Sequence, residues 1–192
     1  MPDVHLPYDF AGPLRTERLL LRTMTVADVD DIHVYQSRED VCRYLPFEPR
    51  TRDQVVEKVT QFSTAVTLRA DNDYWQLAIE EAAGPGRVIG DVYFTIKSVA
   101  NATGEIGWTL HPDFAGRGYM TEGASAVLDI AFEPIGLHRV FANLDPRNDA
   151  SAALCERLGM RREAHFVEDL WFKGDWADTA IYAILDREWR AP

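Results

Sequence analysis

Residues 109–132 constrain the fold more than any other part of the sequence. A short apolar run at residues 106–110 is followed by a proline-containing break and then by Gly116-Arg117-Gly118. After the glycines, apolar residues recur with the 3.6-residue period of a helix that buries one face, at Met120, Ala124, Val127, Leu128, Ala131 and Phe132. The sequence therefore predicts a strand that passes through a glycine-rich turn into the N-terminus of a helix.

Such a junction is able to bind a phosphate. The first turn of a helix leaves backbone N–H groups without partners and carries the positive end of the helix dipole. Glycine takes a positive φ at little cost and lets the backbone approach phosphate oxygens closely, while Arg117 adds a positive charge. Taken alone, the same pattern also fits a strand–helix turn that binds nothing.

Two common phosphate motifs are absent from this stretch. A Walker motif needs lysine after its last glycine, where the chain has Tyr119, and the dinucleotide motif needs a third glycine at Thr121. Residues 115–120, Ala-Gly-Arg-Gly-Tyr-Met, instead resemble the coenzyme A pyrophosphate loop of the GNAT acyltransferases, Q/R-x-x-G-x-G/A. The central glycine, Gly118, is in place, whereas Ala115 and Met120 depart from the pattern. The run Gly-Arg-Gly-Tyr-Met-Thr-Glu-Gly is similar to the RimJ/RimL branch, which acetylates ribosomal-protein N-termini.

A second segment carries the same resemblance. Asn148 and Ser151, followed by residues 154–160, are similar to the family segment in which the asparagine contacts coenzyme A and the next helix flanks the thioester. The opening Thr-Glu-Arg-Leu-x-Leu-Arg, at residues 16–22, is typical of the RimJ/RimL branch. The resemblance thus extends from about residue 14 to about residue 189 and implies a GNAT fold.

The length and composition of the chain are those of one globular domain with room for a full hydrophobic core. The 192 residues are 46% hydrophobic and 27% charged, which is ordinary for a globular protein. There is no apolar run long enough to span a membrane and no signal peptide, and the two cysteines do not make a disulfide framework, so a cytoplasmic location is expected. The net charge of −11 and the lack of a basic patch argue against nucleic acid.

Periodicity and turn signals predict an α+β (mixed α/β) domain. Helices are expected to begin at Thr25 and Thr51 and to follow Gly118 and Asn148; strands are expected at residues 19–22, 74–79, 87–96, 105–110, 139–144, 161–172 and 178–185. Because a helix connects them, the strands at 105–110 and 139–144 should run parallel. The prediction is a central, mostly antiparallel sheet with one splayed parallel pair, flanked by about four helices. Residues 1–13 should form a flexible arm, and residues 14–192 a single GNAT acetyltransferase domain.

The resemblance implies acetyl-CoA as the cosubstrate. Its contacts should come from the strand end, the glycine loop and the second segment, at Thr109, Leu110, Gly116, Arg117, Gly118, Tyr119, Met120, Thr121 and Asn148. No metal is expected, since the five histidines show no paired spacing and no cysteine neighbours.

The family transfers the acyl group directly from thioester to amine, so proton transfer is the task left for side chains. Ser151 matches the position proposed in this branch as the acid toward sulfur, although it is equally suited to capping its helix. Three carboxylates are candidates for relaying a proton: Glu168 is ranked first, Glu105 second, and Asp169 is adjacent to Glu168 in the sequence. Each of them could equally be a solvent-exposed charge on a strand. Cys155 is expected to pack in the core.

The acceptor is expected to be an amine that loses its proton easily. Deprotonation at pH 7 costs about 1 kcal/mol for an α-amine but about 4.6 kcal/mol for a lysine side chain. This difference, the acidic chain and the family branch together favour the N-terminal α-amine of a basic, cationic peptide. A small-molecule amine (an antibiotic or a polyamine) and a non-catalytic coenzyme A sensor or scaffold remain alternatives. The expected partner is therefore a cationic amine, and a homodimer is an option that the sequence leaves open. Neither a nucleic acid nor a membrane is expected as a partner.

Aromatic residues leave two further alternatives open. In the resembled family the first two helices and their linker cover the acceptor pocket, which would give Tyr44 and Phe47 a place in it, while Phe62 is expected in the core. Trp171, Trp176 and Trp189 could stack on a ligand, but tryptophan in a small domain is usually buried, and core positions are expected for them.

Overall fold

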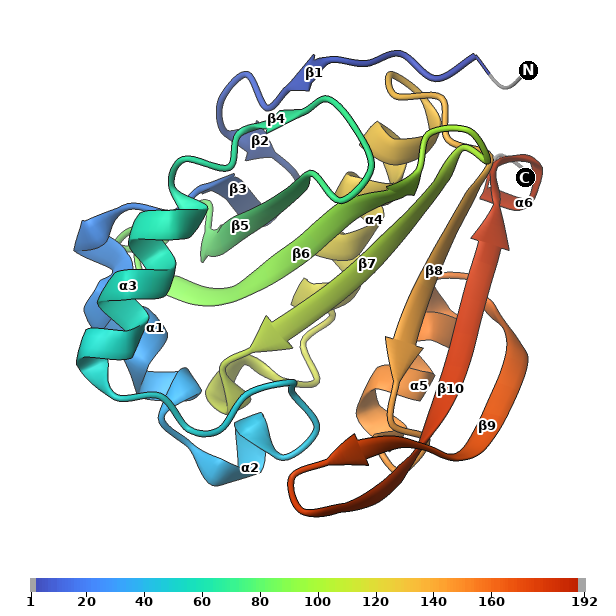
Figure 1. The fold of residues 1–192 in the computed structure, drawn as a ribbon. Helices are drawn as coiled ribbons and strands as arrows, with labels where there is room; N and C mark the ends of the chain where they lie inside the picture. Colours follow the sequence, from blue (N-terminus) through green and yellow to red (C-terminus); the bar gives the residue numbers. More distant parts are fainter. Residues whose placement is uncertain (1–2, 190–192) are drawn as a thin grey trace.

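The computed structural model describes residues 3–189 and is built on one large sheet (Figure 1). Eight strands pair in the order β2-β3-β5-β6-β7-β8-β10-β9, and a separate two-stranded sheet pairs β1 with β4. All neighbours in the large sheet are antiparallel except β7 and β8, which run parallel as predicted. The strands are β1 (Tyr8–Asp9), β2 (Leu14–Arg15), β3 (Leu19–Thr23), β4 (Thr67–Leu68), β5 (Tyr74–Glu81), β6 (Val88–Ser98), β7 (Thr103–Leu110), β8 (Arg139–Leu144), β9 (Arg161–Phe172) and β10 (Asp175–Leu185).

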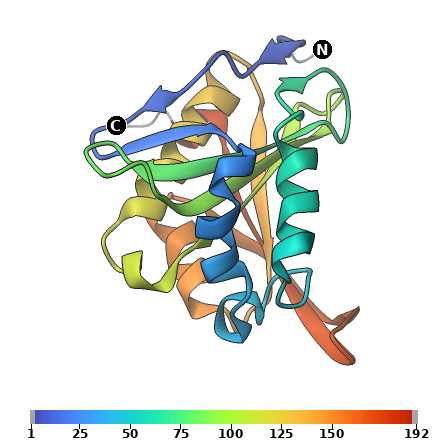
Figure 2. The ribbon, with the colours of Figure 1, turned by 90° about the vertical axis from the view of Figure 1, so that its left-hand side faces the viewer.

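Helices cover both faces of this sheet (Figures 1 and 2). The described residues form α1 (Val29–Gln36), α2 (Glu39–Cys42), α3 (Arg52–Phe62), α4 (Tyr119–Phe132), α5 (Asp149–Arg157) and α6 (Asp186–Trp189), with 3-10 turns η1 (Val26–Asp28) and η2 (Pro112–Phe114). The expected four helices are therefore six, because two single turns, α2 and α6, each add four residues. α4 packs with α5 in the main core, whereas α1 and α3 pack in a second cluster around Ala78 and Val88.

The N-terminal segment is held against the domain, which the sequence did not predict. Tyr8 and Asp9 pair with Leu68 and Thr67, and Phe10 is only 9% exposed in the main core. Its ring lies edge-on to Trp75, with 5.5 Å between the ring centroids. A proline- and glycine-rich composition gave no sign of this packing, in which Val4, Leu6 and Tyr8 also lie against the main core. Residues 1 and 2 of the expected arm, and residues 190–192 of the expected domain, lie outside the described residues.

β7 and β8 separate partway along their length, and this separation positions the site. Ladder pairs join them only at Thr103–Arg139, Gly104–Val140 and Glu105–Phe141. Beyond these pairs β7 continues to Leu110 and β8 to Leu144 without further pairing to each other, and the two strands diverge in Figure 1. The backbone of β7 that faces this gap is therefore left free of strand partners.

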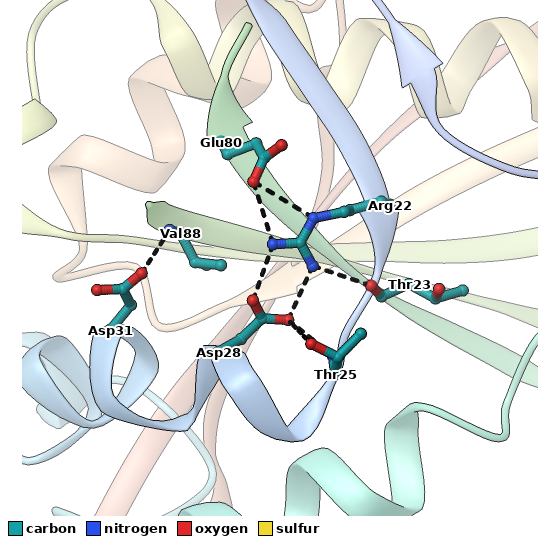
Figure 3. A network of polar contacts seen from close by, with 7 residues as sticks. All are labelled: Arg22, Thr23, Thr25, Asp28, Asp31, Glu80 and Val88. Carbon is teal, nitrogen blue, oxygen red and sulfur yellow. Dashed lines mark hydrogen bonds and ion pairs between the residues drawn. The ribbon is translucent and has the colours of Figure 1, made fainter. Parts of the chain in front are cut away.

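An arginine-centred ion-pair network joins the α1 region to the sheet (Figure 3). Arg22 on β3 donates to both oxygens of Asp28 at 2.8 Å and to Glu80 on β5 at 3.1 Å. Burial would raise the pKa of the Asp28 carboxyl, but hydrogen bonds from Arg22 and Thr25 outweigh it, and the pKa lies below its ordinary value. A capping box joins Thr25 and Asp28 at the helix start that the sequence predicted at Thr25. Asp31 accepts from the backbone N–H of Val88, which adds a contact from α1 to β6.

The hairpin formed by β9 and β10 carries two tryptophans, Trp171 and Trp176, that the sequence predicted to be buried. Trp171 on β9 is 61% exposed and Trp176 on β10 is 52% exposed, and the two rings meet edge to face. Trp189 is partly buried, and its indole N–H donates to Asp129. The hairpin extends away from the main core in Figure 2, and its turn contacts α2 and the α2–α3 linker through Lys173, which donates to the carbonyls of Cys42 and Phe47. Within residues 3–189, no helix has the length and apolar character needed to cross a membrane.

Candidate active site

The glycine loop has the backbone geometry of an anion site. Gly118 is the N-cap of α4 with φ of 78°, and Gly116 has φ of 75°, both in the left-handed region that favours glycine. A Cβ at Gly116 would meet nothing within 4 Å, so the loop faces open space there. Within residues 3–189, the backbone N–H groups of residues 116–121 have no hydrogen-bond acceptor. These amides and the α4 dipole are therefore available to a phosphate.

A cleft of about 920 Å³ lies in front of this loop. Eight of the nine residues predicted to contact the cofactor line it: Thr109, Leu110, Gly116, Gly118, Tyr119, Met120, Thr121 and Asn148. Arg117 does not line the cleft, because its guanidinium donates to the Asp113 carbonyl at 2.9 Å and stabilises the η2 turn. The sequence predicted that the Arg117 charge would contact the phosphate, but the guanidinium binds the backbone of its own loop instead.

Arg18, which the sequence did not single out, lines the cleft and is paired there with Glu122. Its Nε donates to Glu122 at 2.7 Å, and its Nη1 donates to the Arg117 carbonyl at 2.9 Å. Glu122 also accepts from the Thr16 hydroxyl and from the backbone N–H of Arg18. Thr16 and Arg18 belong to the Thr-Glu-Arg opening, which the sequence linked to the family but not to the glycine loop. The structure gives that opening a role, which is to anchor the first turn of α4.

A second cavity, of about 520 Å³, lies on the other side of β7, between the α2–α3 linker and the diverging strands. Its apolar wall includes Tyr44, Phe47, Phe62, Tyr74, Tyr93 and Trp108, and its polar lining includes Gln36, Arg50, Lys58, Gln76, Asp91, Glu105, Asp145 and Ser151. The two cavities share the lining residues Tyr44, Leu45, Trp108, Thr109, Asn148 and Ser151. A molecule in one cavity can therefore meet a molecule in the other at the gap between β7 and β8.

Ser151 lies at this meeting point with its hydroxyl oriented by a neighbour. The indole Nε1 of Trp108 donates to Ser151 Oγ at 3.2 Å. Asn148 caps α5 by accepting from the backbone N–H of Ser151 at 3.1 Å. Capping is thus performed by Asn148, and the Ser151 hydroxyl keeps its own proton to donate.

The two carboxylates ranked from sequence are not brought together. Glu105 lines the second cavity, where Lys97 lies 3.2 Å from its Oε2 and Asn143 donates to its Oε1. Glu168 is exposed on β9 with a positive φ of 48° and lines neither cavity; its backbone N–H donates to Asp178. Asp169 is also exposed on that strand. The difference arises because β9 is the edge strand, beyond β10, while β7 borders the gap.

A buried carboxylate, Asp91, lies in the wall of the second cavity and was not singled out from the sequence. It is 1% exposed and accepts from the Tyr35 hydroxyl at 2.6 Å and from Gln76 Nε2 at 2.5 Å. Burial raises the pKa of Asp91 to about 6, against the opposing effect of these donors and of the Arg50 charge. Its position opposite Thr109 in the β6–β7 ladder could not be known without the strand register.

The remaining candidates behave as structural residues. Cys155 is fully buried, and burial raises the pKa of its thiol to about 12, in agreement with the expected packing role. His111 is buried at the end of β7, and its Nδ1 accepts from the backbone N–H of Asp113. Phe62 lines the second cavity as well as packing on the α1–α3 cluster. Residues 3–189 contain no group of three or more His, Cys, Asp or Glu side chains that could hold a metal ion.

Comparison with known proteins identifies the family. Residues 18–161 match the family model described as Acetyltransferase (GNAT) domain. The chain is 30% identical over 178 residues to an uncharacterised N-acetyltransferase, YnaD, of Bacillus subtilis, covering 92% of this chain and 98% of the relative. A solved structure of a GNAT-family acetyltransferase from Bacillus anthracis is 30% identical, with a TM-score of 0.81 over 91% of this chain and 99% of that chain.

A more distant solved structure matches in fold. The spermidine N-acetyltransferase of Vibrio cholerae, in complex with CoA and spermine, is 21% identical, with a TM-score of 0.76 over 92% of this chain and 100% of that chain. The family match, the relatives and the sheet with one diverging parallel pair all agree. The chain therefore belongs to the GNAT family and is an acetyl-CoA-dependent acetyltransferase.

Proposed function

We propose that the chain transfers the acetyl group of acetyl-CoA directly to a primary amine at the gap between β7 and β8. The observation that carries this proposal is the shared wall of the two cavities, in which Trp108, Thr109 and Ser151 border both. The cleft at the glycine loop takes coenzyme A, with its pyrophosphate on the amides of residues 116–121. The acceptor enters the second cavity, and its amine meets the thioester at the gap.

The chain's own groups then assist the transfer. A backbone N–H of β7 beyond Glu105, left without a strand partner toward β8, stabilises the negative oxygen that forms when the amine attacks the carbonyl. Ser151 donates a proton to the departing sulfur. We propose that Glu105, the carboxylate in the acceptor cavity, accepts the proton that the amine releases and passes it on. Glu168 lies outside both cavities and is the weaker candidate for this role.

The acceptor that we favour is an α-amine, because the deprotonation cost is lowest there. Curated relatives include enzymes for both kinds of acceptor considered from the sequence. A ribosomal-protein uS5 alanine N-acetyltransferase of Escherichia coli is 29% identical over 84 residues, 44% of this chain and 43% of that protein. The spermidine N(1)-acetyltransferase of Vibrio cholerae is 22% identical over 172 residues, 90% of this chain and 95% of that protein. The RimJ/RimL assignment, the cationic acceptor and the homodimer remain predictions; two free buried cysteines are compatible with the cytoplasmic location that we propose.

Two measurements test the proposal. Acetyl-CoA at about 100 times its dissociation constant should add about 2.7 kcal/mol to the free energy of unfolding, which a melting curve detects, whereas NAD and ATP at equal concentration should do much less. Incubation with acetyl-CoA and a mixture of primary amines should release free thiol and give acetylated amines by mass spectrometry. Equal stabilisation by all three nucleotides, or no thiol release with any amine, would overturn it.

A further inference from the structure

The acceptor cavity contains two cationic side chains, Arg50 and Lys58. Neither forms an ion pair with any residue from 3 to 189. The carboxylates of the same cavity have other partners: Glu105 pairs with Lys97, Asp145 pairs with Arg147, and the buried Asp91 accepts hydrogen bonds from Tyr35 and Gln76. The cavity therefore offers two cationic side chains to a ligand, although the net charge of the chain is −11.

Arg50 is held in place by neutral groups. Its backbone N–H donates to the Gln36 carbonyl at 2.9 Å, and its Nη1 donates to the Gln36 side chain at 2.7 Å. The guanidinium lies over the Phe47 ring, with 3.6 Å from Cζ to the ring centroid. In the described part of the chain, the Nε–Nη2 edge of the guanidinium has no acceptor. That edge is the fork that binds a carboxylate with two parallel hydrogen bonds.

A guanidinium that is partly removed from water and has N–H groups without acceptors is unfavourable in free energy. Arg50 is partly buried, and burial lowers its pKa from the ordinary value, although the charge of Asp91 opposes this effect. Asp91 does not fill the fork, since it forms no ion pair with Arg50 and its oxygens accept from Tyr35 and Gln76. A partly desolvated guanidinium that has no direct ion pair is stabilised by an anion that enters with the ligand.

We infer that the acceptor is a free amino acid with an apolar side chain, whose α-carboxylate binds Arg50 while its α-amine faces the gap at Ser151. This inference rests on the proposed acetyl transfer and names its substrate class. The cavity volume of about 520 Å³ is that of a small-molecule site. The wall of Tyr44, Phe62 and Tyr74 offers an apolar surface to the acceptor's side chain.

The Arg50 contact also assists the chemistry. A free carboxylate next to an amine favours the ammonium form, because opposite charges attract. When the guanidinium neutralises the carboxylate, that attraction weakens and the amine loses its proton more easily. A weak base such as the Glu105 carboxylate is then sufficient to accept the amine proton.

The test compares acceptors that differ only in the carboxylate. Rates of thiol release from acetyl-CoA are measured for L-phenylalanine against phenethylamine, L-tryptophan against tryptamine, and L-leucine against isopentylamine. At least one acid should exceed its decarboxylated partner in kcat/KM by about tenfold or more, since a charge-assisted pair contributes about 1.5–3 kcal/mol. Arg50→Met should reduce that ratio to within about threefold of one, and Arg50→Lys, which keeps the charge without the fork, should give an intermediate ratio.

Arg43→Met is the matched control, because Arg43 is exposed, lines neither cavity and should leave the ratio unchanged. If Arg50→Met does not fold, the ratios of the parent and of Arg50→Lys decide the matter. Acetylation of the amines with no advantage for any acid, or of peptide N-termini alone, overturns the inference and leaves the acetyl transfer standing. An unchanged ratio in a folded Arg50→Met protein also overturns it.

Discussion

The indole N–H of Trp108 donates to the hydroxyl oxygen of Ser151 across 3.2 Å. Indole nitrogen is a donor only, so the Ser151 oxygen accepts and the Ser151 proton points elsewhere. Asn148, and not Ser151, accepts the backbone N–H that a helix cap must satisfy. The two uses of Ser151 that the sequence left open are thus separated by geometry, and the contact supports its proposed role as the acid.

Replacing the donor should weaken this acid without removing it. Trp108→Phe keeps most of the aromatic wall but loses the hydrogen bond, and we expect kcat to fall by about three- to tenfold. Ser151→Ala should lower kcat by about 10²-fold, because it removes the proton donor itself. Steady-state thiol release measures both, with Trp176→Phe on the exposed hairpin as the control. A larger loss from Trp108→Phe than from Ser151→Ala would contradict this order.

Gly118 should be required for coenzyme A binding more than for folding. Gly118→Val places a β-branched residue at φ of 78° in the loop and obstructs the approach of a phosphate to the backbone. Calorimetric titration should detect no acetyl-CoA binding, while circular dichroism shows a folded protein with a lowered melting point. Gly174→Val is a matched control, since Gly174 has φ of 88°, is exposed in the turn between β9 and β10, and lines neither cavity. Binding that survives in Gly118→Val would place the pyrophosphate elsewhere.

Local patterns in the sequence predicted the elements that follow local rules. The capping residues Thr25, Thr51 and Asn148, the apolar face of α4 and the bounds of β8 all follow from side chains within a few positions of one another. The residues that complete the site, among them Arg18, Arg50 and Asp91, depend on which strands and helices lie side by side. Their partners are distant in the chain, as with Tyr35 and Asp91, so no local pattern reveals them. The sequence ranks Glu168 first as the proton relay because it does not show that β9 lies at the edge of the sheet, away from both cavities.

The Arg22 network should make a measurable contribution to stability. Arg22→Met leaves Asp28 and Glu80 without their counterion, and these side chains are only 6% and 12% exposed. We expect a loss of about 3 kcal/mol in the free energy of unfolding, measured by urea denaturation. The control is Arg52→Met, whose exposed ion pair with Asp30 should be worth less than about 1 kcal/mol. Equal losses in the two variants would show that the buried network contributes no more to stability than the exposed ion pair.

Asp91 should make the protein less stable as the pH rises. Its folded pKa of about 6 lies above the ordinary 3.8, so between about pH 4 and pH 6 the folded state holds a proton that the unfolded state has lost. Stability from this group is therefore greatest at low pH and is lost as the pH rises through 6. Asp91→Asn does not titrate, so its stability relative to the parent should increase by about 1.4 kcal/mol from pH 5 to pH 7.5. Urea denaturation at both values measures the change, and a constant difference would mean that Asp91 stays ionised when buried.

The choice between Glu105 and Glu168 as proton relay is decided by one pair of isosteric variants. Glu105 borders the acceptor cavity beside Asn143, whereas Glu168 is exposed on the edge strand. A carboxylate that relays the amine proton must lie within reach of the amine, directly or through one water. We therefore expect Glu105→Gln to lower kcat by about 10²-fold with acetyl-CoA affinity retained, and Glu168→Gln to change kcat by less than about threefold.

The pH profile separates a chemical role of Glu105 from a structural one. If Glu105 only orients Lys97, the Gln variant should keep the parent's dependence of kcat on pH and lose activity equally at all values. If it relays the proton, the deficit should shrink as the pH rises, because more of the amine then arrives already deprotonated. Thiol release measured from pH 6 to pH 9.5 distinguishes these cases. A large loss in Glu168→Gln, with little in Glu105→Gln, would instead require β9 to approach the acceptor cavity during turnover.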